Sequence, residues 1–108
     1  MNTNDIIFAK TIVRQPGVCD VTYCDGTTDV VWRGIGDLYD LLTLISNRGR
    51  YLMIGRSSLI CENNIVMINP SKGKLVLAFD SLGKRHQMLE FSDNLLRELR
   101  GNFLYNNK

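Results

Sequence analysis

Few side chains in this sequence have the types and spacing that catalysis requires. The single histidine, His86, follows Arg85 at the start of a predicted strand, a place that favours a surface residue over a general base. Ser57 and Ser58 have no base near them in the sequence and no nucleophile-elbow motif around them. We therefore expect no enzyme activity, no catalytic residue and no small-molecule substrate.

Metal and nucleotide signatures are also incomplete. One histidine and three cysteines without a Cys-x-x-Cys spacing do not make a zinc-binding pattern. The segment Gly34-Ile35-Gly36 opens a predicted helix, as a phosphate-binding loop does. However, the remaining glycine, the lysine and the ribose-binding acid of such loops are missing. We interpret these residues as turn glycines and expect neither a cofactor nor a metal.

The cysteines and the first residues indicate the compartment. The cysteines are Cys19, Cys24 and Cys61, an odd number that does not suit a disulfide framework. Residues 1–5 carry no basic residue, and no apolar stretch approaches the length of a signal core or a membrane span. We expect a soluble, cytoplasmic protein that does not contact a membrane. Its 108 residues suit one domain, with residues 1–5 and 105–108 flexible.

The charge is distributed unevenly along the chain. Residues 46–86 hold seven basic and two acidic residues, a net charge of +5, whereas the rest holds six basic and nine acidic residues, a net charge of −3. A basic segment of this kind is typical of a protein that binds a polyanion, because neutralising phosphates releases counterions. The alternative is an ordinary solvated surface, and charge alone favours that alternative.

The elements that must position these charges are mostly β-strands. Alternating or β-branched runs bounded by turn residues predict strands at 6–13, 18–23, 27–32, 51–54, 58–61, 65–68, 75–79 and 87–91. Asp25-Gly26 predicts a tight hairpin between the second and third strands. The segment Gln15-Pro16-Gly17 predicts the turn between the first and second strands. The chain is therefore expected to be mainly β, with small antiparallel sheets.

Two helices complete the prediction. Apolar residues at helical spacing predict an amphipathic helix over residues 36–46, with acidic residues in its first half and arginines after its end. Ser92 is a suitable N-cap for a short C-terminal helix, which Gly101 is expected to end.

The order of these features resembles that of a LytTR-type DNA-binding domain. Residues 51–68 carry an aromatic residue, a short basic segment ending in Arg56-Ser57, an aliphatic strand, an Asn turn and an Ile-x-x-Ile strand. The hairpin at 18–32, the Leu-x-x-Leu helix at 35–42 and the closing segment at 90–99 agree in order, so the resemblance extends from about Ile12 to Leu104. It implies an elongated arrangement of three small antiparallel sheets that reads DNA by loops rather than by a recognition helix.

The resemblance also implies a set of contact residues and a partner. The partner is double-stranded DNA, bound by a homodimer on paired promoter repeats. Arg56 and Asn94 would contact bases, and Arg14 lies near the first contacting loop. Phosphate contacts would come from Ser57 and Arg97, and also from Lys72 and Lys74, which lie in a turn of the basic segment and are not part of the family pattern. The function implied is that of a bacterial transcriptional regulator, the kind of effector domain that response regulators carry.

The sequence departs from the family pattern at two places. Many members have Arg-x-His-Arg-Ser where this chain has Met53-Ile54-Gly55-Arg56-Ser57, and Asp93-Asn94 stands where Arg-Arg often follows the serine. A carboxylate beside a phosphate is repulsive. The alternative is therefore a protein-interaction module of the same fold that has lost DNA binding, in which exposed strand edges or Trp32 would contact a partner.

Overall fold

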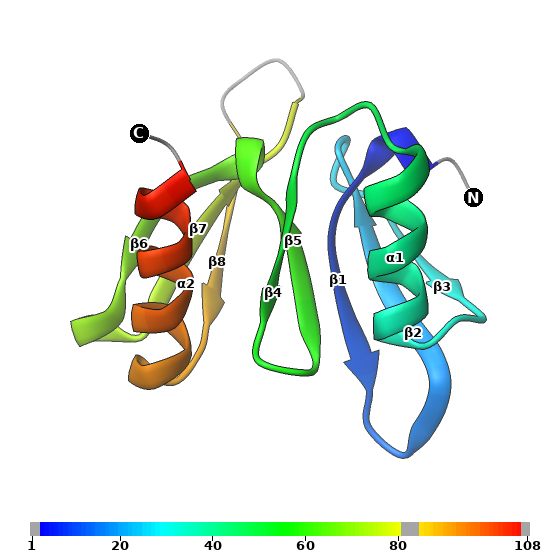
Figure 1. Ribbon diagram of the computed structural model, residues 1–108, viewed down its shortest axis with the longest axis horizontal. Helices are drawn as coiled ribbons and strands as arrows, with labels where there is room; N and C mark the ends of the chain where they lie inside the picture. The colour runs from blue at the N-terminus through cyan, green and yellow to red at the C-terminus, as the bar shows by residue number, and fades with distance from the viewer. Residues whose placement is uncertain (1–2, 81–84, 107–108) are drawn as a thin grey trace.

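Eight short β-strands and two α-helices make up the computed structural model, which describes residues 3–80 and 85–106 (Figure 1). In chain order the elements are β1 (Ile6–Ile12), β2 (Gln15–Tyr23), β3 (Thr28–Val31), α1 (Ile35–Ile45), β4 (Tyr51–Ile54), β5 (Ser58–Cys61), β6 (Ile65–Asn69), β7 (Lys74–Ala78), β8 (His86–Glu90) and α2 (Asp93–Asn106). Three single 3-10 turns are η1 (Thr3–Asp5), η2 (Glu62–Asn64) and η3 (Pro70–Lys72). The mainly β prediction is confirmed.

The first sheet has five antiparallel strands in the order β3-β2-β1-β5-β4. Side chains alternate across it because successive residues of a strand face opposite sides. One face is apolar and is covered by α1, whose Leu38 and Leu42 are fully buried. The other face carries Phe8 and Lys10 of β1.

The second sheet has three antiparallel strands in the order β6-β7-β8, and α2 packs against it. Leu75 and Leu77 of β7 and Leu96 and Leu99 of α2 are buried in the same core as the first sheet. Phe8 of β1 meets Phe91 edge to face, with ring centroids 6.5 Å apart. This aromatic contact joins the two sheets.

The number of sheets and the shape differ from the expectation. Three small sheets in an elongated body were expected, but the strands form two sheets in a flattened body of 33 × 33 × 24 Å. The reason is that β1 pairs with both β2 and β5, so that the predicted β2–β3 hairpin and the β4–β5 pair belong to one sheet. That pairing joins residues about fifty positions apart, which no local pattern encodes.

Two local predictions are also wrong. Gln15-Pro16-Gly17 belongs to β2, and the turn before it is formed by Val13 and Arg14, since Ile12 pairs with Gln15. Helix α2 has 14 residues and continues through Gly101 to Asn106. The helix is longer than Gly101 suggested because Phe103, one turn after Leu99, also packs against the core.

The predicted hairpin at Asp25-Gly26 is confirmed. Gly26 has φ +90°, which suits glycine, and the Asp25 carboxylate accepts hydrogen bonds from the Thr27 amide at 2.9 Å and the Thr27 hydroxyl at 2.6 Å. The turn directs Cys24 toward the second sheet, where its carbonyl oxygen accepts a hydrogen bond from the Asp80 amide at 2.9 Å.

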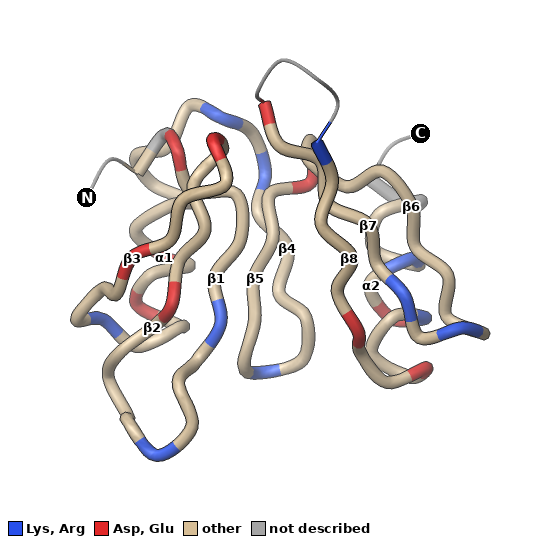
Figure 2. The backbone as a smooth tube through the Cα atoms, turned by 180° about the vertical axis from the view of Figure 1, so that it is seen from behind, with Lys and Arg blue, Asp and Glu red and all other residues tan. Residues whose placement is uncertain are grey.

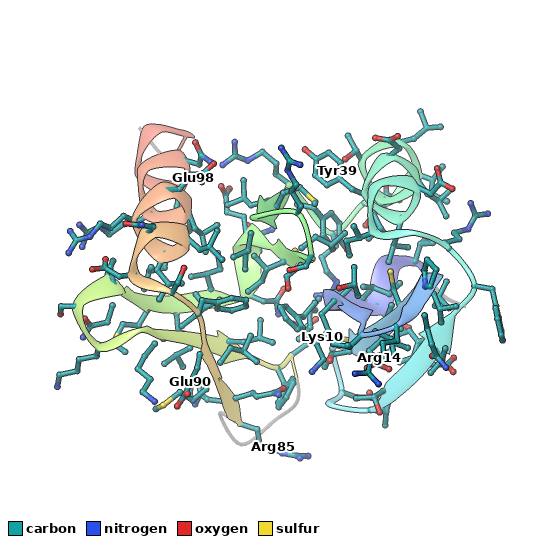
Figure 3. The ribbon with its side chains drawn as sticks, turned by 90° about the horizontal axis from the view of Figure 1, so that it is seen from below. Lys10, Arg14, Tyr39, Arg85, Glu90 and Glu98 are labelled. Carbon is teal, nitrogen blue, oxygen red and sulfur yellow. The ribbon has the colours of Figure 1, made fainter. Side chains whose placement is uncertain are left out.

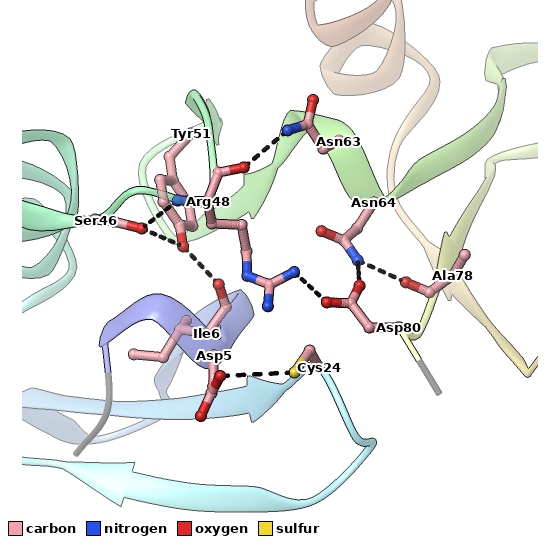
Figure 4. A network of polar contacts seen from close by, with 10 residues as sticks. All are labelled: Asp5, Ile6, Cys24, Ser46, Arg48, Tyr51, Asn63, Asn64, Ala78 and Asp80. Carbon is pink, nitrogen blue, oxygen red and sulfur yellow. Dashed lines mark hydrogen bonds and ion pairs between the residues drawn. The ribbon is translucent and has the colours of Figure 1, made fainter. Parts of the chain in front are cut away.

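A network of polar contacts links the two sheets (Figure 4). It lies at the upper end of the molecule in the view of Figure 1. The Arg48 guanidinium donates to Asp80 at 2.5 Å, and the Asn64 amide donates to Asp80 at 3.0 Å and to the Ala78 carbonyl at 2.9 Å. The buried Tyr51 hydroxyl donates to the Ile6 carbonyl at 2.6 Å. Arg48 therefore serves the fold rather than a partner.

Asp80 is expected to make the stability of the fold sensitive to acid. Partial burial disfavours its charge, but the hydrogen bonds from Arg48 and Asn64 prevail and hold its pKa below the ordinary value. A lowered folded pKa stabilises the fold above the unfolded pKa, about 4, and that contribution is lost as pH falls through the folded pKa. Asp80→Asn should therefore be less stable than wild type at neutral pH.

The measurement is urea denaturation of both proteins from neutral pH to below about pH 3. The difference in unfolding free energy between wild type and Asp80→Asn should narrow as the pH falls below about 4. Comparing the two removes the contributions of Asp25 and Glu90, whose pKa values are also lowered, by hydrogen bonds from Thr27 and Lys74. A constant difference across this range would contradict the role of the Asp80 charge.

Candidate functional site

Three segments lie next to one another at the end of the molecule opposite the polar network: the β1–β2 turn, the β4–β5 turn and the start of α2, with the β4–β5 turn in the middle (Figure 1). The amide of Thr11, near the end of β1, donates to the Ser57 carbonyl at 2.8 Å. A Cβ atom at Gly55 would lie 3.0 Å from the Leu95 side chain, so the β4–β5 turn packs directly on the first turns of α2. We call this set of segments the loop end.

The β4–β5 turn presents Arg56 and Ser57. Ile54 pairs with Ser58, which leaves residues 55–57 as the turn. Gly55 has φ +63°, a left-handed conformation that glycine adopts without strain, and its missing side chain permits the contact with Leu95. The side chains of Arg56 and Ser57 are exposed. The position of this segment in a turn agrees with the prediction.

Arg14 lies at the tip of the β1–β2 hairpin. It has φ +67°, and it is the one non-glycine residue with a positive φ among residues 3–80 and 85–106. Such a conformation is uncommon for an arginine, and here it occurs at the second residue of a two-residue turn, since Ile12 pairs with Gln15. Arg14 is exposed, and its neighbour Val13 is 83% exposed. The tip therefore projects both residues into solvent, as Figure 3 shows for Arg14.

Asn94 and Arg97 lie on the first two turns of α2 and differ in their availability. Asn94 is exposed in the first turn, just after Ser92, whose hydroxyl is 3.4 Å from the Leu95 amide. The Arg97 guanidinium forms an ion pair with the Asp93 carboxylate one turn earlier. An exposed pair at this spacing stabilises a helix by only about 0.3–0.5 kcal/mol. It nevertheless opposes any contact of Arg97 with a phosphate.

The two lysines of the η3 turn also differ. Lys72 is exposed, and its amide donates to the Asn69 side chain at 3.3 Å, which fixes the turn. Lys74 pairs across the sheet with Glu90, and their side chains form an ion pair. The η3 turn lies close to the start of α2. The amide of Phe91, just before the helix, donates a hydrogen bond of 3.1 Å to the carbonyl of Gly73, just after the turn.

In the structure, some basic residues of the predicted basic segment form ion pairs and others do not. Arg48 pairs with Asp80, Arg50 with Glu62 and Lys74 with Glu90, so these charges are compensated locally. Within the described part of the chain, no ion-pair partner is found for the exposed Arg14, Arg56 and Lys72. Figure 2 shows basic residues at both hairpin turns of the loop end. The candidate interface is thus smaller than the sequence suggested.

Sequence reasoning missed Lys10. It is exposed on β1 and pairs in register with Ser58, two residues from Arg56. Lys10 lies outside the basic segment at 46–86 and is therefore not among the predicted contact residues. The available signal was its alternation with the apolar Ala9, which predicts a solvent-facing position on a strand.

Other kinds of site find little support among the described residues. Among residues 3–80 and 85–106, no group of three His, Cys, Asp or Glu side chains is arranged to hold a metal ion. Burial raises the pKa of the Cys19 and Cys61 thiols, which disfavours their reactive thiolate forms. His86 is exposed on β8. In that same part of the chain, neither helix is long and apolar enough to cross a membrane.

One solved structure shares this fold. It is the LytTr DNA-binding domain of a protein described as a methyl-accepting/DNA response regulator from Bacillus cereus, and it superposes with a TM-score of 0.57. The similarity covers 96% of this chain and 84% of that one, at 13% sequence identity. No protein-family model matches the sequence, and no curated protein matches it either. The predicted LytTR-like fold is therefore confirmed in three dimensions although the sequences have diverged widely.

Proposed function

We propose that this chain belongs to a bacterial, cytoplasmic transcriptional regulator and reads promoter DNA through its loop end. The observation that carries the proposal is that the segments bearing Arg14, Arg56 and Asn94 lie at one end of the fold, where the exposed Arg14 and Arg56 have no ion-pair partner within the described residues. The fold is that of a DNA-binding domain in the Bacillus cereus protein, which supports the same partner here.

The roles within the loop end follow from side-chain chemistry. Arg56 can donate two hydrogen bonds to the edge of a guanine, and the Asn94 amide can pair with an adenine. Ser57 and Lys72 would contact phosphates, which fix the register without reading sequence. The ion pairs of Lys74 and Arg97 make these two residues weaker candidates than the sequence suggested.

The test is selection of bound sequences from a random pool of duplex DNA, followed by a salt titration on the selected duplex. A paired short repeat in the selected pool would support both sequence reading and binding by a homodimer. If Arg14, Lys72 and Lys10 each neutralise one phosphate, the logarithm of affinity should fall with the logarithm of salt concentration at a slope of about −3 per domain.

The competing function is a protein-interaction module. The Asp93–Arg97 pair favours it, because it places a carboxylate at the loop end and occupies an arginine. Failure of the wild-type protein to bind any duplex at about 50 mM salt would reject DNA binding and support this alternative.

A further inference from the structure

An open groove of about 430 Å³ is lined by residues of both sheets. It lies on the side of the molecule away from the helices, the side on which Figure 3 shows Lys10 and Glu90. Its floor is the uncovered face of the five-stranded sheet, with Lys10, Asp20 and Ser58 among the lining residues. Its wall is β8, which contributes Gln87 and Glu90. The groove is therefore polar and accessible, and it begins beside the loop end.

The strand register places the polar residues of the floor in one row. Lys10 is directly opposite Asp20 on β2 and directly opposite Ser58 on β5. Lys10 is exposed, and no ion pair within 4.0 Å joins it to Asp20 or to any other described residue. Glu90 is already engaged by Lys74. Lys10 is thus a cation available to a ligand, and Asp20 is the opposing charge beside it.

The two faces next to the loop end differ in charge. Helix α1 carries the exposed Asp37 and Asp40 and no lysine or arginine, so its face repels phosphates. On α2, the acidic Asp93 and Glu98 are matched in number by Arg97 and Arg100, whereas Lys10 and Arg14 lie on the side of the sheets (Figure 3). A duplex that rests on the loop end and extends past it will encounter less repulsion over the groove than over α1.

We propose that the bound duplex extends from the loop end over this open sheet face, where Lys10 contacts a backbone phosphate. The Ser58 side chain, in register with Lys10, lies beside the same contact. Asp20 weakens the binding by repulsion, so its charge limits affinity for any sequence. This inference rests on the proposed DNA binding and adds the face along which the DNA lies.

The experiment measures the affinity of the full chain for a short fluorescent duplex of mixed sequence by anisotropy, across a salt series. Lys10→Ala should weaken binding about five-fold, the effect of one unit charge at contact distance in water, and should reduce the salt slope by about one. Asp20→Asn should tighten binding about two-fold, since it removes a repulsive charge somewhat further from the phosphate. A merely structural role of Asp20 does not predict tighter binding.

Two variants with the same charge changes are the controls. Arg85→Ala removes a cation that precedes β8 at the opposite end of the molecule, and Asp37→Asn removes an exposed carboxylate on α1. Both should change the affinity less than their counterparts. The inference is overturned if Lys10→Ala behaves like Arg85→Ala, or if Asp20→Asn does not tighten binding relative to Asp37→Asn. If wild type binds and Arg56→Ala weakens binding in the same series, the proposed function survives that failure.

Discussion

Phe8→Ala is expected to lower the free energy of unfolding by about 3–5 kcal/mol, the usual cost of deleting a buried aromatic side chain. Phe8 is 5% exposed and meets Phe91 at the junction of the two sheets. Its loss removes apolar burial from both sheets at once, and the strand on which it lies pairs on both sides. The small core of a 108-residue chain leaves little reserve, since such domains are stable by about 5–15 kcal/mol.

Urea denaturation followed by circular dichroism measures this loss. Phe8→Leu, which keeps most of the volume, should cost less than half as much. Trp32→Ala is the control for removal of an aromatic side chain from the surface, because Trp32 is 84% exposed, and it should change stability by no more than about 0.5 kcal/mol. A cost for Phe8→Ala similar to that of Trp32→Ala would contradict the role of Phe8 in joining the sheets.

The strands were predictable because their signals are local. Alternation and turn chemistry located β4 and β5 to the residue, and Asp25-Gly26 located the β2–β3 hairpin. The turn at Val13-Arg14 was missed because Pro16 and Gly17 are stronger turn formers in isolation. Here the pairing of β1 with β2 overrides their preference. Likewise, tertiary packing of Phe103 overrides the tendency of Gly101 to end α2.

The candidate site was only partly predictable, since the availability of a charge depends on its neighbours in space. The pairing of Asp93 with Arg97 follows from their spacing of four residues on a helix and was within reach of sequence reasoning. The pairing of Lys74 with Glu90 depends on the β7–β8 register, and that of Arg48 with Asp80 depends on how the sheets meet. No local pattern reveals either of them.

Arg56→Ala is expected to lower affinity for a selected DNA site by about 1–3 kcal/mol, roughly a 5- to 150-fold rise in Kd. Arg56 is exposed on a turn that Gly55 packs against α2, so its backbone is well positioned and its side chain is free to meet a base edge. A guanidinium that pairs with a guanine carries both charge and sequence information. Its removal should therefore weaken specific binding more than binding to mixed sequence.

Arg97→Ala and Arg85→Ala separate this role from charge alone. Each removes one positive charge, but Arg97 is already paired with Asp93, and Arg85 stacks over Phe79 with its guanidinium 5.7 Å from the ring centre. Both should leave the preference for the selected site over mixed DNA unchanged. If Arg56→Ala weakens binding equally on all sequences, Arg56 is a phosphate contact and sequence must be read elsewhere. In that case Asn94, which lies on the helix that supports this turn, is the residue on which base reading would depend.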